Sequence, residues 1–564
     1  MGLGILEDTK LEHVPGECFW VNAGPEATPT PADEMDPRLK YDTRGPKPIL
    51  LIPQPSDDPN DPLNWPMWKR DLITLVLCAI SVSVEFVVDG GVLFRLGPLL
   101  AANTVWLKVQ LRISFTDTAL LTGWHLLGVG VAGFFFVPTS RVWGKRHAYI
   151  IATLLLIGSS VWGGAAKGHK SLLWARVFQG FAVAPFEALV NASIGDMYCV
   201  HDRGKRMAFT NFALYGGAFL TPVIVGKLTI EQSWRWVFYW VAIAGAVISP
   251  FVWFFVPETA YRREVNTDID DTSALFNSSD SSNKEFPEGS ARNVPASSTD
   301  DEITAAKSIP PKKTFLQSLA LFDGRKTDDS LWKLALRPLP LLFQPAIIWG
   351  MLTQGALIGW TVLIGVVIGA FYSGPPKFYA MDKVGYLYTG SFLGALAGFI
   401  VSGVLADSTA KLLAKWNNGV YEPEFRIILV IPQLIFGVMG VFGFGYTADD
   451  VEKWGDIIPP MFFGFEVMGM VLGATSSALY LVDAHRDIAI ESFTALLLFK
   501  NFFSFALTWY GFDWINETSV WKMMWAAGTA QICICLLSVP MYIFGKRNRS
   551  FFHRHNILEM CGLD

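Results

Sequence analysis

The sequence has few charged residues and no recognisable nucleotide-binding motif. Charged residues make up 17% of the chain, against about 25% in ordinary soluble domains. The net charge of -5 is small for 564 residues, and it provides no basic surface of the kind that binds nucleic acid. The chain has no P-loop, so nothing supports ATP-driven pumping. We therefore expect no nucleic-acid partner and no nucleotide-driven activity.

Reactive and metal-binding side chains are also sparse. The six cysteines are scattered, and Cys533 and Cys535 fall on different sides of a helix. No cysteine pair has metal-ligand spacing, and the eight histidines include no HxxxH-type cluster. We interpret the cysteines as small buried hydrophobic residues. The sequence therefore predicts no metal, no cofactor and no enzymatic activity.

Hydrophobic residues are abundant and form long runs. They make up 51% of the chain, which has 42 Phe and 21 Trp residues. A helix that spans a bilayer needs about 20 mainly apolar residues. On that rule we predict an all-α membrane protein with twelve transmembrane helices, at roughly 72–94, 118–138, 147–166, 171–194, 211–230, 235–256, 341–370, 385–406, 426–446, 457–480, 489–510 and 521–545.

Polar stretches divide these runs into two sets of six. "DPNDPLNWPMWKR" (residues 58–70) combines prolines, which oppose helix, with the tryptophans and the Lys-Arg pair typical of a membrane surface. A stretch rich in Ser, Asp and Pro separates the sets, and we expect it to be disordered. The predicted domains are a cytosolic N-terminal segment (1–70), an N-terminal six-helix bundle (71–256), a largely disordered cytosolic linker (257–338), a C-terminal six-helix bundle (339–545) and a cytosolic tail (546–564).

The orientation follows from the ends of the runs. The first 60 residues are polar and proline-rich and contain no cleavable signal peptide. Lysine and arginine are biased toward the loops that then lie inside. We therefore expect both termini in the cytosol. The plasma membrane is favoured, and the vacuolar membrane is the alternative. Asn516 heads a sequon in a predicted outer loop and is a candidate glycosylation site.

Motifs at the ends of the runs resemble the major facilitator superfamily of secondary transporters. "PTSRVWGKRHAYI" is similar to the family's basic turn, G-x-x-x-D-x-x-G-R-R/K, between its second and third helices. Arg141 stands where the family has aspartate, and the second half carries the counterpart "GVLADSTAKLLAKW". The resemblance implies that these turns latch and release the two bundles through Arg141, Gly144, Lys145, Arg146, Gly403 and Asp407.

Further motifs occur in the order that the family shows. "RVFQGFAVAPFE" is similar to its R-x-x-Q-G motif, and the sixth run closes with the frequent ending "VPET". "YGGAFLTPVIVG" partly matches the glycine-proline antiporter motif through Gly216, Gly217, Pro222 and Gly226, with Thr221 in place of a glycine. The opening stretch, "NNGVYEPEFR" and "FKNFFSF" resemble a fungal branch of proton-linked drug, polyamine and cation transporters. The resemblance covers about residues 55–548.

Ionisable residues inside the predicted helices are the candidate functional residues. Each costs about 2.5–3.5 kcal/mol at the bilayer centre on insertion scales. Glu85 and Asp89, four apart, share one helical face, and Arg176 and Glu187, about three turns apart, share another. The other candidates are Glu466 and Lys500. We expect Asp483 and Glu491, near the cytosolic end, to form salt bridges with Arg486.

In the superfamily, helices 1, 4, 7 and 10 line a central cavity. The resemblance therefore implies an acidic cavity with Glu85, Asp89, Glu187 and Glu466, in which Arg176 holds one carboxylate ionised until substrate or a proton displaces it. We expect Lys500 to pair with an acid across the bundle, and Trp360 to stack on the substrate. Structural roles are the alternatives: helix–helix hydrogen bonding for Glu85, capping of a broken helix for Asp89, and repair of the kink at Pro185 for Glu187.

The predicted function is secondary active transport of a small organic cation or drug-like compound by alternating access. Proton coupling with efflux by antiport is favoured. The alternatives are proton-driven uptake of polyamine-like cations and a nontransporting sensor on the same fold. The expected partners are the small-molecule substrate, protons and the lipid bilayer, and the chain is expected to be a monomer.

Overall fold

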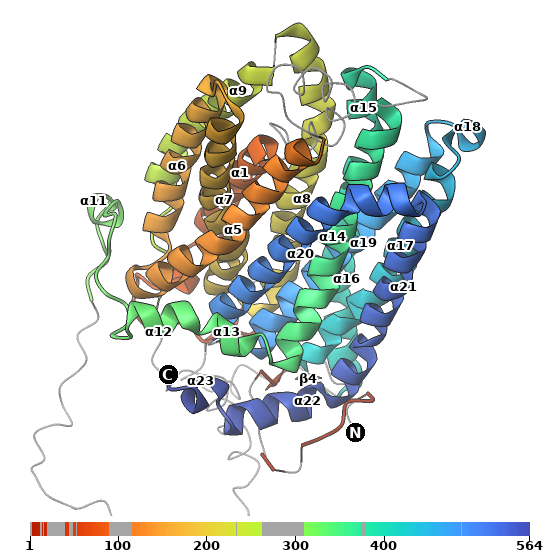
Figure 1. Cartoon of the computed structure of the whole chain (residues 1–564). Helices are drawn as coiled ribbons and strands as arrows, with labels where there is room; N and C mark the ends of the chain where they lie inside the picture. Colours follow the sequence, from red (N-terminus) through yellow and green to blue (C-terminus); the bar gives the residue numbers. More distant parts are fainter. Residues whose placement is uncertain are drawn as a thin grey trace, which may run out of the picture.

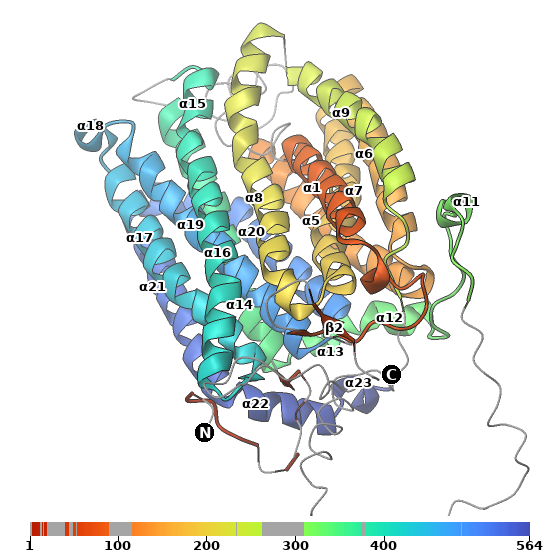
Figure 2. The ribbon, with the colours of Figure 1, turned by 180° about the vertical axis from the view of Figure 1, so that it is seen from behind.

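Long helices that run side by side make up most of the described chain (Figure 1). The computed structural model describes residues 3–8, 10–11, 14, 16–19, 40–43, 49–51, 53–88, 115–232, 234–261, 310–373, 379–486 and 488–563. Both chain ends lie at one end of the molecule, which we call the termini end. The short helices α15 and α18 lie at the opposite end (Figures 1 and 2).

The N-terminal half contains six long helices. They are α1 (Met67–Val88), α5 (Phe115–Trp143), α6 (Arg146–Ala165), α7 (His169–Met197), α8 (Val200–Glu231) and α9 (Trp234–Phe255). Helix α7 packs against α1, α5 and α6, and α9 covers α1 and α6. A Cβ atom at Gly128 would lie 2.6 Å from the carbonyl oxygen of Val177. Helices α5 and α7 therefore approach each other at a distance that only glycine allows.

The C-terminal half repeats this plan. Its elements are α14 (Pro345–Ser373), α15 (Met381–Leu387), α16 (Thr389–Trp416), β4 (Val420–Tyr421), the 3-10 helix η5 (Pro423–Leu429), α17 (Val430–Ala448), α18 (Val451–Trp454), α19 (Ile458–Ala484), α20 (Ala489–Glu517) and α21 (Val520–Leu536). Helix α19 packs against α14, α16 and α17, and α14 also contacts α20 and α21. Helix α19 is the most buried of the described membrane-spanning helices of this half, and we therefore expect its polar residues to have partners.

Each of the twelve predicted apolar ranges overlaps one of these long helices, with residues 89–94 of the first range outside the described residues, so the twelve-helix fold is confirmed. Eleven spans within the described residues are long and apolar enough to cross a membrane, and the chain is a multi-pass membrane protein. Several helices are longer than predicted. For example, α5 ends at Trp143 and α16 at Trp416. The apolar run marks the length that can face lipid, whereas backbone hydrogen bonding continues beyond it.

Smaller elements cover the termini end. They are β1 (Cys18–Phe19), β2 (Tyr41–Asp42), β3 (Ile49–Leu50), the 3-10 helix η2 (Pro62–Asn64), α11 (Phe315–Ser318), α12 (Leu331–Leu336), α13 (Pro338–Leu341), α22 (Ser538–Arg554) and α23 (Ile557–Met560). Strand β1 pairs with β4 and β2 pairs with β3, both antiparallel. Figure 1 shows α22 and α23 lying across the ends of the long helices.

Part of the predicted linker is folded onto the N-terminal half. Residues 310–341, of which we expect 310–338 to be linker, contain α11, α12 and α13, and α12 packs against α5. The backbone N–H of Lys326 donates to the carbonyl oxygen of Val142 at 2.6 Å. Residues 262–309 lie outside the described residues.

The two halves meet along two seams. Helix α5 packs against α20, as Figure 1 shows, and α8 packs against α16, as Figure 2 shows. Helix α7 also contacts α20, and α8 contacts α15 and α19. Residues on these five pairs of helices therefore contribute most to holding the described parts of the two halves together.

Candidate functional site

A chain of buried charges crosses the α8 seam at the termini end. Arg203 of α8 donates from Nη1 to Oδ1 of Asp483 on α19 at 2.6 Å, and each side chain is 1% exposed. The second carboxylate oxygen of Asp483 accepts from the Tyr421 hydroxyl at 2.8 Å and from Arg426 Nε at 3.2 Å. Asp483 is thus held by an arginine from each half through charge-assisted hydrogen bonds.

Arg426 extends this network to the second basic turn. Its Nη1 lies 3.6 Å from Oδ1 of Asp407, and its Nη2 donates to the carbonyl oxygen of Val200 in the other half at 3.4 Å. A Cβ atom at Gly403 would lie 3.7 Å from the Cβ of Ala208. Gly403 therefore faces α8 across the seam.

The first basic turn makes its own contact with the C-terminal half. Arg141 Nε lies 3.2 Å from Oε1 of Glu491 on α20, and the side chains are 32% and 2% exposed. Arg337 approaches the same oxygen at 4.0 Å. Arg141 occupies the position where the family has aspartate, yet it still bridges the halves because an acid faces it. The expected pairing of Asp483 and Glu491 with Arg486 is therefore corrected. Among the described residues, Asp483 forms ion pairs with Arg203 and Arg426. Glu491 forms ion pairs with Arg141 and Arg337.

The rest of the first turn has partners in the N-terminal half. Oε1 and Oε2 of Glu258, in the "VPET" ending, accept from the backbone N–H groups of Lys145 at 2.9 Å and Arg146 at 3.0 Å. An anion at the start of α6 satisfies free N–H groups and the helix dipole. Burial raises the pKa of Glu258 above its usual value, although three backbone amides and Lys145 oppose the shift.

Gly144 makes this arrangement possible. Its φ of +90° is a conformation that residues with side chains rarely adopt, and a Cβ atom there would overlap the Glu258 carboxylate. Lys145 Nζ lies 2.6 Å from Asp196 of α7, and Arg146 donates to backbone carbonyls at the end of α9 and in α11. These contacts tie α6 to its own half and to the linker. Among the described residues, Arg141 is the one of the four gating residues predicted in this turn that forms an ion pair with the other half.

A buried ion pair joins the halves deeper in the membrane. Lys500 Nζ of α20 lies 2.6 Å from Oε2 of Glu187 on α7, and the side chains are 8% and 11% exposed. Glu187 is ten residues from the end of α7, and Lys500 is eleven from the start of α20. At 1.5 Å per residue both lie about 15 Å from the termini end, close to the middle of a hydrocarbon core about 30 Å thick. The expected pairing of Lys500 with an acid across the bundle is present.

Arg176 lies in the same helix but has another arrangement. It is fully buried, and its Nη1 donates to Oε1 of Gln179 at 2.8 Å, whose amide in turn donates to Ser160. A Cβ atom at Gly180 would overlap the backbone of His125. The R-x-x-Q-G motif therefore joins α7 to α5 and α6 within one half, and the recorded cationic partner of Glu187 is Lys500.

Glu466 and Trp360 lie inside the C-terminal half. The Thr361 hydroxyl of α14 lies within hydrogen-bond distance of both carboxylate oxygens of Glu466, at 2.8 and 3.0 Å, and Glu466 is fully buried. The backbone of Glu466 packs against Gly440 of α17. Trp360 is 7% exposed and makes an edge contact with Phe503 of α20. Both residues are packed among helices in this conformation.

Neutral polar residues add two contacts between the halves that sequence reasoning did not single out. Gln354 Nε2 of α14 donates to the Tyr215 hydroxyl of α8 at 2.8 Å. Asn211 Nδ2 of α8 donates to Thr475 Oγ1 of α19 at 3.3 Å. The available signal was an amide side chain inside an apolar run, which is costly without a partner.

Some predicted residues cannot be placed. Asp89 lies outside the described residues, as do the side chains of Glu85 and Asn516 and the surroundings of Gly226. Of the glycine-proline motif, Gly216, Gly217 and Pro222 lie in α8. Thr221, at the position of the missing glycine, donates from its hydroxyl to the Gly217 carbonyl at 2.8 Å.

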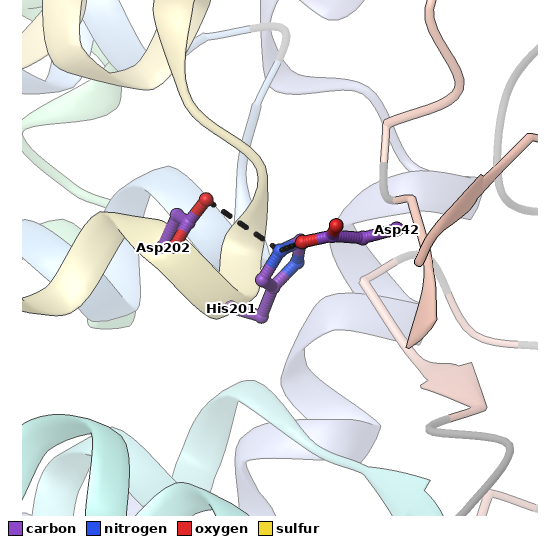
Figure 3. A group of neighbouring side chains, drawn as sticks. All are labelled: Asp42, His201 and Asp202. Atoms are coloured by element: carbon purple, nitrogen blue, oxygen red, sulfur yellow. Dashed lines mark hydrogen bonds and ion pairs between the residues drawn. The ribbon is translucent and has the colours of Figure 1, made fainter. Parts of the chain in front are cut away.

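One cluster of side chains has the composition of a metal site. Figure 3 shows His201 of α8 between Asp42 of β2 and Asp202, with Nε2 at 3.3 and 3.6 Å from their carboxylate oxygens. One ligand atom from each residue lies within 4.8 Å of the other two. The other oxygen of Asp202 lies 3.4 Å from Arg206. The distances suit an imidazole that bridges two carboxylates, so the cluster connects the N-terminal segment to α8.

An apolar groove lies away from these charges. It is lined mainly by α15, α16 and α19 at the opposite end, with Gly390, Gly394 and Gly464 along it, and has a volume of about 570 Å³. Leu393 and Met461 on its rim are exposed on the surface of the helices. Its walls contain none of the predicted site residues.

Comparisons with known proteins agree with the helix arrangement. A family model for the Major Facilitator Superfamily matches residues 92–499. An uncharacterized MFS-type transporter of Schizosaccharomyces pombe is 25% identical, covering 89% of this chain and 88% of the relative. The efflux pump radE of Floropilus chiversii is 24% identical, covering 96% and 90%. The solved structure of the proton:xylose symporter XylE matches with a TM-score of 0.56 at 14% identity, covering 85% of this chain and 96% of that chain.

Proposed function

The chain belongs to the Major Facilitator Superfamily of secondary transporters, and from that premise we propose that it exchanges protons for a small organic cation or drug-like compound. The two halves rock about a central site, and the compound leaves the cell as protons enter. The termini end faces the cytosol, in keeping with the bias of lysine and arginine toward that end.

The observation that carries this proposal is the ion pair between Glu187 and Lys500. Rocking of the halves separates α7 from α20 and pulls the carboxylate from the ammonium, which lie 2.6 Å apart. Breaking a buried pair leaves uncompensated charges and is strongly unfavourable. The halves therefore open readily only when another cation takes the place of Lys500 at Glu187.

A proton and an organic cation compete for that position. Protonation neutralises Glu187, and an ammonium group of a substrate pairs with it, so either one removes the cost of its bare charge. Since one carboxylate holds only one of them at a time, arrival of the substrate releases the proton. Water that enters the opened side hydrates Lys500. This competition supports exchange of a cation for a proton.

The charged contacts at the termini end act as the gate. Arg203–Asp483 and Arg141–Glu491 join α8 to α19 and α5 to α20. Both must break before the central residues meet the cytosol. The structure thus corresponds to the closed state of that end. Export is the favoured direction because the glycine-proline motif is partly present in α8, and because one relative is named an efflux pump.

Flux of labelled cations into proteoliposomes under an imposed pH gradient tests the proposal. Tetraphenylphosphonium and spermidine serve as probes for amphipathic and polyamine-like cations. We expect Glu187→Gln to lower gradient-driven flux by about tenfold or more, since a lost interaction of about 1.4 kcal/mol corresponds to a factor of ten. Glu452→Gln, an exposed acid on α18, is the matched control and should transport like the wild type.

The other outcomes separate the alternatives. Equal flux in the wild type and Glu187→Gln would contradict the role of the ion pair. Movement of the cation together with protons, from the proton-rich side to the proton-poor side, would identify cation uptake by symport. Binding of a probe without accumulation would identify a nontransporting sensor.

A further inference from the structure

The chain before α1 contacts both halves at the closed gate. We call the described residues between 3 and 61 the N-terminal strap. From residue 53 onward it leads into η2 and α1 and so belongs to the N-terminal half. Its first part is docked on the C-terminal half, where β1 pairs with β4 and the backbone N–H of Leu6 donates to the Ile543 carbonyl at 2.9 Å.

Charged groups hold the first part of the strap in place. Lys546 of α22 lies 2.5 Å from Glu7 and 2.6 Å from Glu17. The Ser550 hydroxyl donates to Asp8 at 2.6 Å. A Cβ atom at Gly16 would lie 3.0 Å from the carbonyl oxygen of Asp483. The strap therefore rests directly on the backbone of a gate residue.

The later part of the strap is tied to the N-terminal half. Asp42 contacts His201 at the start of α8 (Figure 3), and the Tyr261 hydroxyl, just after α9, donates to Asp58 at 3.0 Å. The 21 residue steps from residue 19 to residue 40 allow these two residues to separate by up to about 70 Å, at about 3.3–3.6 Å per residue. Tethering alone therefore does not hold the halves together, and side chains that contact both halves must do so.

Ile5 is a strap side chain that is buried together with residues of both halves. It is 5% exposed and belongs to one apolar cluster with Val200 of the N-terminal half and with Ala410, Ala414, Tyr421 and Phe425 of the C-terminal half. Tyr41 of the strap packs against the same cluster. Val200 begins α8, three residues before Arg203. Separation of the halves at this end exposes the apolar surface of Ile5 and Val200 to water, which is unfavourable.

We propose that the N-terminal strap is a built-in clamp that stabilises the state closed at the termini end, with Ile5 as the residue that seals the seam. This inference rests on the proposed alternating access for its consequence, because a clamp has an effect only if that end opens. Truncation of Ile5 therefore shifts the equilibrium toward the open state by the free energy with which Ile5 stabilises the closed state over the open one.

Cys199 is a native reporter of this equilibrium. It lies beside Val200 and is 4% exposed, whereas Cys561, beyond the last membrane-spanning helix, is exposed and provides the reference rate. The experiment measures labelling by N-ethylmaleimide in the full-length protein in nanodiscs, with each cysteine followed by peptide mass spectrometry. We expect Ile5→Ala to accelerate labelling of Cys199 by about tenfold, because truncation of a buried isoleucine removes its contacts. Labelling of Cys561 should not change.

Leu6→Ala is the matched control, since Leu6 is 37% exposed and contributes its backbone N–H, which alanine retains. Ile5→Val should give an intermediate rate and tests the proposal if Ile5→Ala fails to fold. Equal Cys199 labelling in the wild type, Ile5→Ala and Leu6→Ala would overturn the clamp. The assay needs no substrate. If the wild type exchanges no cations but Ile5→Ala accelerates Cys199 labelling, the proposed function alone is contradicted. If the wild type exchanges cations but Ile5→Ala leaves Cys199 labelling unchanged, the clamp alone is contradicted.

Discussion

The two basic turns, at Arg141–Arg146 and Gly403–Lys411, occupy corresponding places in the two halves but carry opposite charges at the seam. In the first turn a base, Arg141, faces the acid Glu491 of the other half. In the second an acid, Asp407, belongs to a network in which Arg426 donates to the Val200 carbonyl across the seam. The contact between halves therefore depends on complementary charge and not on which half carries the acid.

The turns also differ in burial. Arg141 is about one-third exposed, whereas Arg426, Arg203 and Asp483 are almost completely buried. Exposed ion pairs contribute about 0–1 kcal/mol, while removal of one partner from a buried pair costs about 3–5 kcal/mol. We infer that the α8 seam is the strong side of the gate and the α5 seam the weak side.

The largest expected effect is on the strong side. Asp483→Asn leaves Arg203 and Arg426 buried without their shared counter-ion, so we expect the free energy of unfolding to fall by about 3–5 kcal/mol. Thermal unfolding in detergent measures this. Asp202→Asn, whose i,i+4 partner Arg206 is partly exposed, should cost less than about 1 kcal/mol. Similar losses in both variants would contradict the difference between buried and exposed pairs.

The glycines of the two turns sharpen the comparison. Gly144→Ala places a Cβ atom at φ +90° and into the Glu258 carboxylate, so we expect a loss of about 2 kcal/mol of stability from backbone strain and a weakened cap. Gly403→Ala adds a methyl group in ordinary contact with Ala208 within a helix. It should be neutral or stabilise by up to about 1 kcal/mol. The melting temperatures of the two variants check this. Equal shifts would mean that the positive φ at position 144 does not require glycine.

On the weak side, a double-mutant cycle measures the contact of the first turn. We expect Arg141→Gln and Glu491→Gln to show a coupling of about 1 kcal/mol, because one partner is buried and the other is a third exposed. The pair Lys313–Asp323, which is more exposed and lies within the linker, serves as the reference and should couple more weakly. A coupling near zero for Arg141 and Glu491 would show that this ion pair does not help to hold the two halves together.

The smallest effect concerns pH at the strap, beside the second turn. Burial raises the pKa of Glu17 to about 7, with Glu422 acting in the same direction and Lys546 and Arg549 opposing it. Glu7 shares Lys546. Because the folded-state pKa is above the unfolded value, the stability from protonated Glu17 is fully present below about pH 4.5 and is lost as pH rises through about 7.

Glu17→Gln cannot ionise and therefore reports this loss. We expect its melting temperature, relative to the wild type, to rise between pH 5 and pH 8. Glu7→Gln, which removes a more exposed carboxylate from the same Lys546, is the matched control. A constant difference between Glu17→Gln and the wild type across this range would contradict the assignment.

Much of the architecture could be predicted residue by residue. Apolar runs located all twelve helices, because the length of a run reports directly on the bilayer thickness. The cost of a charge in lipid pointed to Glu187 and Lys500 before their partners were known. The partner of Glu187 was harder to predict. Arg176 lies on the same face of the same helix, but it donates to Gln179, and Lys500 comes from the other half.

Composition along the chain specifies which segments cross the membrane and which side chains are too costly to face lipid. Both depend on composition over about 20 neighbouring residues, so no knowledge of packing is needed. Helix packing, in contrast, brings Arg141 to Glu491, places Asp483 between Arg203 and Arg426, and puts Ile5 at the seam. Asp483 lies 57 positions from Arg426 and 280 from Arg203, and the contacts between halves depend on how the two bundles face each other, which local sequence does not encode.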